Sequence, residues 1–221
     1  MPDTIKTSIS GKSRFHPILL IIGFTVFCGI SQLSRLYYPL FVLVVIAGIA
    51  LPLAWGGFTK NWKAIGFSRQ NLGKALFWGI CAGIVSSLAG LAVLQERAFV
   101  RDLGQQLLIG IPLWILVISP FQEFFFRGWM QSGLTEALGK WWGLVISTTC
   151  FTVWHYLSPI VDLAIFPLES TGGIISTFAA GLAFGYAFQL SKNIIAPWLG
   201  HLIAGIVFII IGAMDFVLVI Q

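Results

Sequence analysis

The sequence predicts an all-helical membrane protein, a polytopic bundle of seven to eight transmembrane helices. Of its 221 residues, 57% are hydrophobic and only 10% are charged, whereas an ordinary soluble domain carries about a quarter charged residues. The mean hydropathy is +0.92, and the apolar residues gather in segments near the ~20 residues that a helix needs to cross a bilayer. This composition excludes a soluble domain, a disordered tail and a nucleic-acid-binding protein.

Apolar segments follow one another along the whole chain. The first runs from about Ile18 toward Leu33 and lacks a cleavage site with small residues, so we interpret it as a retained span rather than a signal peptide. The last contains Pro197 and several glycines, and a break there would make eight spans. No repeat or soluble linker is visible, so residues 1–221 are expected to form a single transmembrane domain. The segments after the first cover residues 38–56, 72–94, 105–130, 141–157, 172–190 and 194–220.

The basic residues predict the orientation of the chain. The stretch from Thr59 to Asn71 mixes lysines with aromatic residues, which is typical of a short helix or loop at the headgroups. With seven spans and the N-terminus inside, the outer loops hold only Arg35, Arg97 and Arg101. Because basic residues collect on the cytoplasmic side of a membrane, we expect a cytoplasmic N-terminus. The inner segments then hold Lys6, Lys12, Arg14, Lys60, Lys63, Arg69, Lys74, Lys140 and Lys192.

The apolar segments contain the ionisable residues Glu123, Arg127, His155, His201 and, near the outer end of the last segment, Asp215. At mid-bilayer each such group costs about 2.5–3.5 kcal/mol and therefore marks either function or pairing. Glu123 and Arg127 are four residues apart on one helix face, so they can form a structural ion pair. His155 lies in the fifth segment and His201 in the last. A lone histidine in a membrane is often only hydrogen-bonded to a neighbouring helix. Each residue taken alone therefore leaves a structural role open.

Their depths in the membrane favour a common site. The fourth and fifth segments are joined by a short polar connection near Gly139, with Glu123 16 residues before this glycine and His155 16 residues after it. In an antiparallel hairpin the two lie at similar depth, and His201 lies about 12 Å in from the same side. A carboxylate and two imidazoles can activate water: the carboxylate takes the proton, one imidazole orients or shares it, and the other stabilises the oxyanion.

Three short motifs carry these residues. The first reads QEFFFR from Gln122 to Arg127, the second FTVWH from Phe151 to His155, and the third HLIAG from His201 to Gly205. They resemble the E-E-x-x-x-R, F-x-x-x-H and H-x-x-x-N motifs of the CPBP family of intramembrane proteases, the CAAX-processing and bacteriocin-processing enzymes also called Abi proteins. The resemblance covers about residues 62–210.

The resemblance implies an intramembrane endopeptidase that hydrolyses a membrane-proximal peptide bond with a glutamate- and histidine-activated water. It implies catalytic roles for Glu123, His155, His201 and Gln122, with structural support from Arg127, Phe151 and Gly205. The expected partners are membrane lipids and a peptide or membrane-protein substrate, in the plasma membrane of a prokaryote. No cofactor or metal ligand is predicted: the chain lacks an H-E-x-x-H zinc motif, and metal dependence stays open by analogy with the family.

Two departures from the family motifs bear on activity. Gln122 replaces the first glutamate, and an amide cannot accept a proton at neutral pH. Gly205 replaces the asparagine, and losing one oxyanion donor costs on the order of 10²–10³ in rate in other hydrolases. One hypothesis is an active peptidase in which Glu123 takes over as the base after a small rotation of its helix. The alternative is a protease-like membrane scaffold that binds a partner membrane protein. A small transporter is disfavoured because no repeat is present.

Overall fold

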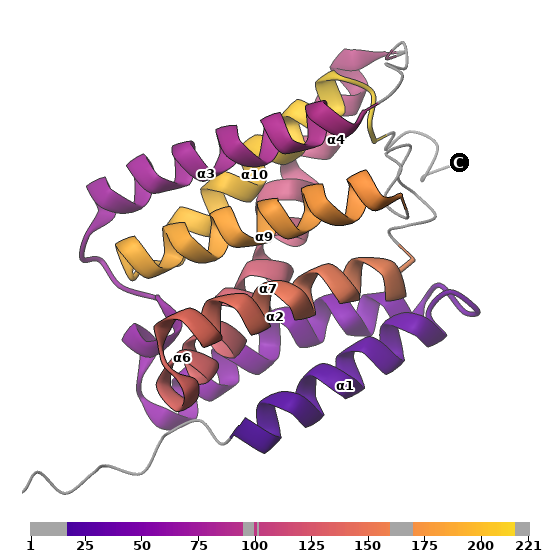
Figure 1. Ribbon diagram of the computed structural model, residues 1–221. Coiled ribbons are helices and arrows are strands. Elements are labelled where there is room, and N and C mark those ends of the chain that lie inside the picture. Colours follow the sequence, from indigo (N-terminus) through magenta and orange to yellow (C-terminus); the bar gives the residue numbers. More distant parts are fainter. Residues whose placement is uncertain (1–16, 95–99, 101, 160–169, 215–221) are drawn as a thin grey trace, which may run out of the picture.

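In the computed structural model the described residues are 17–94, 100, 102–159 and 170–214. Their regular structure is helical (Figure 1), which confirms the all-α prediction. The longer elements are α1 (Pro17–Leu33), α2 (Leu40–Thr59), α3 (Leu72–Val93), α4 (Leu103–Leu113), α5 (Ser119–Glu123), α6 (Ser132–Leu138), α7 (Lys140–Leu157), α9 (Thr171–Ser191) and α10 (Ile195–Ile210). A 3₁₀ turn, η1 (Trp62–Ile65), and two π-helical segments, η2 (Trp114–Ile118) and η3 (Phe124–Gln131), complete them.

Among the described residues, four helices are long and apolar enough to cross a membrane: α2, α3, the continuous helix Leu103–Leu138, and α9. Helices α1 and α10 are apolar but shorter. Large apolar side chains face outward, among them Val42 on α2 and Leu88 on α3, which are 57% and 60% exposed. Exposed apolar surface on this scale suits a lipid environment. The chain is therefore an integral membrane protein, and the number of seven to eight crossings stays a prediction.

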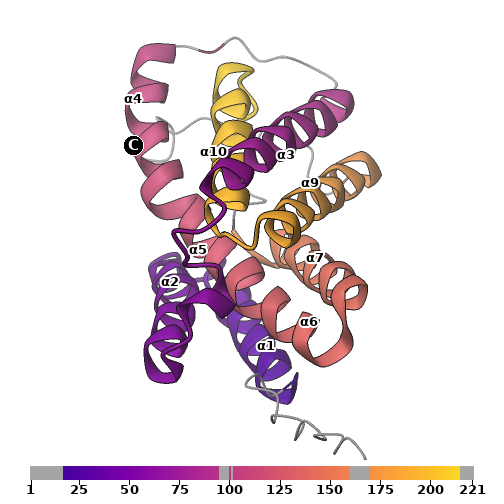
Figure 2. The same ribbon diagram turned by 90° about the vertical axis from the view of Figure 1, so that its left-hand side faces the viewer.

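The helix Leu103–Leu138 runs through the centre of the bundle, where its parts contact α2, α7 and α10 (Figure 2). It contains Pro120, whose ring would clash with the carbonyl group of Leu116 in an ideal α-helix. The wider π-helical turn η2 includes Leu116, and a second π-helical segment, η3, begins directly after Glu123. Wide turns of this kind occur often at functional sites. The two π-helical segments therefore lie on either side of Glu123, the acidic residue of the first motif.

Glycines let α3 and α10 approach closely. A Cβ atom at Gly200 would lie 3.0 Å from the carbonyl oxygen of Gly79, and one at Gly83 would meet the side chain of Ile203. Small residues at such contacts allow close backbone packing in membranes, where the hydrophobic effect does not drive helices together. This contact fixes the rotation of α10, on which His201 is buried next to Gly200.

Gly139 forms the predicted turn between the fourth and fifth segments. It has a positive φ of 89° and separates the end of α6 from the start of α7, and the two helices pack against each other. The hairpin prediction is therefore confirmed. The helix before the turn is longer than the predicted segment 105–130, because it continues to Leu138 through part of the connection expected from Thr135 to Lys140.

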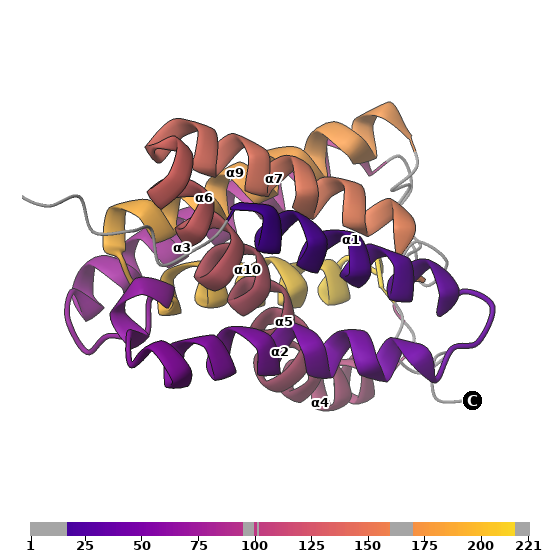
Figure 3. The same ribbon diagram turned by 90° about the horizontal axis from the view of Figure 1, so that it is seen from below.

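One end of the bundle gathers most of the described lysines. Helices α2, α6 and α9 end there, at the left of Figure 1, and α3 and α7 begin there; the same end is visible from below in Figure 3. The connection through η1 is tied to the α9–α10 turn, because Asn193 Nδ2 donates to the carbonyl oxygens of Ser68 and Gln70 at 2.7 and 2.9 Å. We call this the basic end; its lysines are Lys60, Lys63, Lys74, Lys140 and Lys192.

Candidate active site

Glu123 and His201 are joined by a short hydrogen bond between two helices. His201 Nδ1 donates to Glu123 Oε1 at 2.7 Å, across 78 positions of sequence. The carboxylate is fully buried and His201 is 6% exposed. An ionised carboxylate only accepts hydrogen bonds, so Nδ1 carries the proton. The Nε2 atom of His201 is therefore the nitrogen that remains for chemistry.

Arg127 holds the other side of the carboxylate. Its Nε atom lies 3.3 Å from Glu123 Oε2, and both side chains are fully buried. The guanidinium Nη2 also donates to the carbonyl oxygen of Gly181 at 3.1 Å. Its Cζ atom lies 4.1 Å from the centre of the Phe151 ring, a cation–π contact. The predicted ion pair on one helix face is therefore present, and it supplies the positive charge that a buried carboxylate needs.

His155 joins the same cluster through Phe151. Its ring lies 4.3 Å from the Phe151 ring, and the His201 ring lies 6.3 Å from it, measured between centroids. His155 Nδ1 lies 2.8 Å from the carbonyl oxygen of Phe151. A carbonyl only accepts hydrogen bonds, so this Nδ1 also carries a proton. Each histidine is thus positioned by a hydrogen bond at Nδ1, and its Nε2 atom stays available for chemistry. Phe151 contacts both imidazole rings.

Gln122 is buried but stands apart from this network. Its side chain is 1% exposed, and no hydrogen bond joins it to Glu123, His155 or His201 in the part of the chain that the structure describes. Its Oε1 atom has no hydrogen-bond partner there. Successive helical residues point about 100° apart, which explains why Glu123 contacts His201 while its neighbour does not.

Two aromatic residues complete the site, and the sequence did not single them out. Phe184 stacks on the His201 ring at 5.1 Å with an interplanar angle of 18°. Trp114 lies 5.2 Å from the same ring, and its indole fills the position that a Cβ atom at Gly205 would take. Aromatic residues are common in apolar segments, so no sequence signal distinguished these two. Their contacts fix the plane of the imidazole.

In the described ranges, no three His, Cys, Asp or Glu side chains stand close enough together to hold a metal ion. The described contacts of Glu123 are instead with an imidazole and a guanidinium. The arrangement holds the His201 imidazole, polarised by Glu123, in apolar surroundings. An imidazole placed in this way can act in general acid–base catalysis.

Fold and site define an integral membrane protein with a buried acid–imidazole cluster between its helices. The family model described as "Type II CAAX prenyl endopeptidase Rce1-like" matches residues 104–207, a range that includes all of the site residues above. The match confirms the resemblance to the CPBP family of CAAX-processing proteases that the three motifs indicate. No curated protein and no solved structure matches the chain.

Proposed function

We propose that the protein is an intramembrane endopeptidase that hydrolyses a membrane-proximal peptide bond, with water activated by the Glu123–His201 pair. The observation that carries the proposal is the 2.7 Å hydrogen bond between the buried carboxylate and His201, inside the region that matches the model of a protease family. The proposal includes a single membrane domain, a cytoplasmic N-terminus and a peptide or membrane-protein substrate.

His201 is the proposed base, with Glu123 acting through it. His201 Nδ1 donates to one carboxylate oxygen, while the other lies 3.3 Å from Arg127 Nε in an ion pair and has no hydrogen-bond partner among the described residues. Because the carboxylate is fully buried and His201 is 6% exposed, the proposed water lies at the imidazole. As the water oxygen attacks the carbonyl carbon, its proton passes to His201 Nε2, and the carboxylate stabilises the imidazolium that forms. When the C–N bond breaks, the same proton passes to the leaving amine. This differs from the expectation that the carboxylate itself takes the proton.

His155 and Gln122 are proposed to position the reacting groups. The Nδ1 atom of His155 donates to the Phe151 carbonyl, so the neutral ring keeps an unprotonated Nε2 that can accept a hydrogen bond from the attacking water and orient it. The amide of Gln122 supplies donors and an acceptor that can hold a water molecule, and its Oε1 atom is buried without a hydrogen-bond partner in the described residues. Water activation in this scheme does not need a carboxylate at position 122.

Cleavage by the purified full chain tests the proposal. The protein, reconstituted in liposomes together with solubilised total membrane proteins, is expected to generate new peptide termini detectable by mass spectrometry. His201→Gln should abolish these termini while thermal unfolding in detergent shows a folded protein. Identical termini from wild type and His201→Gln would refute the assignment. A stoichiometric partner that co-purifies without any cleavage would instead support the scaffold, which no contact described above specifically favours.

A further inference from the structure

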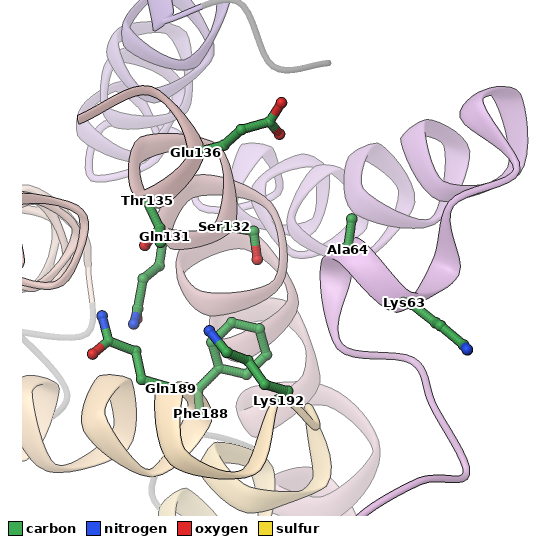
Figure 4. Close-up of a pocket in the computed structure, with 9 residues that line it drawn as sticks. All are labelled: Lys63, Ala64, Gln131, Ser132, Thr135, Glu136, Phe188, Gln189 and Lys192. Carbon is green, nitrogen blue, oxygen red and sulfur yellow. The ribbon is translucent and has the colours of Figure 1, made fainter. Parts of the chain in front are cut away.

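A cavity of about 280 Å³, lined by both polar and apolar groups, lies at the basic end, away from the catalytic cluster (Figure 4). Three elements that are distant in sequence enclose it: η1, the last turns of the helix Leu103–Leu138, and the end of α9. Gln131 forms part of its wall: its Nε2 donates to the carbonyl oxygen of Gly185 at 2.9 Å, and the Ser147 hydroxyl lies 3.5 Å from its Oε1. The wall is therefore held by a fixed polar network.

Two lysines bring positive charge to this cavity, which Glu136 also lines with a carboxylate that points away from both of them (Figure 4). Lys192 follows α9 in the left-handed conformation, with φ of 54°, and Figure 4 shows its side chain lying beside Phe188 while Lys63 points outward at the rim. No ion pair of either lysine with a carboxylate occurs within the described ranges. Burial, and secondly the charge of Lys140, lower the pKa of Lys192. An anion in the cavity would offset the unfavourable free energy of burying the charged Lys192 ammonium.

One buried acceptor in the cavity wall lacks a donor. Gln189 is 6% exposed, and its Nε2 donates to the carbonyl oxygen of Lys140 at 2.7 Å. Its Oε1 atom has no hydrogen-bond partner among the described residues. A buried acceptor left unpaired is unfavourable, because it has lost its hydrogen bonds to water. A ligand that satisfies the cavity therefore combines an anionic group with a hydrogen-bond donor.

The location favours a lipid over a soluble ligand. The cavity lies where the apolar helices α2 and α9 end, which is the headgroup level of a bilayer-spanning bundle. Next to η1, Phe58 at the end of α2 is 89% exposed and Trp62 is 42% exposed. Tryptophan is enriched at membrane interfaces, and an apolar surface beside the cavity can accommodate an acyl chain. The headgroup of a lipid can then lie in the cavity while its acyl chain lies on the apolar surface next to it.

We propose that this cavity binds the headgroup of a phospholipid whose phosphate lies against Lys192 and whose hydroxyl or ammonium group donates a hydrogen bond to Gln189 Oε1. Glycerol and ethanolamine headgroups carry such a donor, whereas the quaternary ammonium of choline has none. Phosphatidylglycerol and phosphatidylethanolamine therefore bind and phosphatidylcholine binds poorly. This site does not depend on the proposed peptidase activity.

Native mass spectrometry of the purified full chain in detergent tests the site. Binding of phosphatidylglycerol, phosphatidylethanolamine and phosphatidylcholine with the same acyl chains is compared. Lys192→Asn, which suits the left-handed conformation, is expected to weaken phosphatidylglycerol binding about tenfold or more, the loss of a charge-assisted hydrogen bond. Lys60→Asn is the matched control, because Lys60 is also a left-handed residue after a helix, with φ of 52°, and does not line the cavity.

A second variant tests the acceptor at Gln189 separately from the charge at Lys192. Gln189→Met keeps the side-chain length but removes the acceptor, so the preference for phosphatidylglycerol and phosphatidylethanolamine over phosphatidylcholine should disappear. Equal binding of all three lipids by the wild type, or equal losses in Lys192→Asn and Lys60→Asn, would overturn the proposal. Glycerol 3-phosphate that binds as tightly as the lipid would also overturn it, because the ligand would then be a soluble phosphate.

Discussion

The indole of Trp114 occupies the space that a side chain at position 205 would need. The glycine at this position, which departs from the asparagine of the family motif, is therefore matched by a large residue on another helix. Trp114 is 5% exposed and also contacts the His201 ring. Loss of the asparagine side chain thus leaves a packed aromatic wall beside the imidazole rather than a void.

Restoring the asparagine is expected to harm this protein. Gly205→Asn forces the new side chain against Trp114 and should cost about 1–3 kcal/mol of unfolding free energy, as overpacking does. Gly205→Asn combined with Trp114→Ala should recover part of that loss. Thermal unfolding in detergent measures both, with Gly73→Asn as control because nothing lies within 4 Å of a Cβ atom at Gly73. Wild-type stability in Gly205→Asn would contradict the packing argument.

Two variants should separate the contribution of the Glu123–Arg127 pair to stability from its contribution to cleavage. Glu123→Gln leaves a buried guanidinium without its counter-charge and should cost about 3–5 kcal/mol. Adding Arg127→Met should restore much of the stability, since an ion pair replaced by apolar groups is often neutral. The double variant should still lack cleavage, because His201 has lost its carboxylate. Chemical unfolding and the cleavage assay are measured on the same preparations, and cleavage by the double variant would exclude a chemical role for Glu123.

Position 122 distinguishes the two possible bases. If His201 takes the proton, Gln122→Leu removes only a water-holding amide and should lower the cleavage rate on the order of tenfold. His201→Gln should reduce it far more. Initial rates at a single substrate concentration suffice for this comparison. Cleavage that appears only in Gln122→Glu, and not in the wild type, would show that the base was lost with the family glutamate.

Lys192 predicts a pH dependence of stability. Its pKa is lowered in the folded protein by burial and by Lys140, from an ordinary value of 10.5. Between the lowered and the ordinary pKa the unfolded chain binds more protons, so the folding free energy becomes more favourable as the pH rises through this window. Lys192→Asn should flatten this rise, measured by thermal unfolding in lipid-free detergent at several pH values below 10.5. An unchanged profile in Lys192→Asn would contradict the assignment, and Lys60→Asn controls for the lost charge.

Several features of the fold follow from local sequence. The apolar segments could be placed because only long apolar helices satisfy their backbone inside a bilayer, and Gly139 marked the turn that brings η3 and α7 together. Glu123, Arg127, His155 and His201 stood out because ionisable residues are costly in apolar segments. The polar connection predicted from Thr135 to Lys140 is instead helical up to Leu138, and its residues Thr135 and Glu136 line the cavity at the basic end.

The sequence by itself determined the helical class, the approximate helix positions and the residues whose burial needs a reason. Only the tertiary structure decided that His201 rather than Arg127 holds Glu123 Oε1, that Trp114 fits against Gly205, and that Lys192 and Gln189 share a cavity with η1. The physical reason is that a helix in lipid is apolar on its outer face as well as on much of its inner face. Its hydrophobic pattern therefore does not indicate which face of the helix packs against its neighbours. Rotation is set by contacts between residues far apart in the chain.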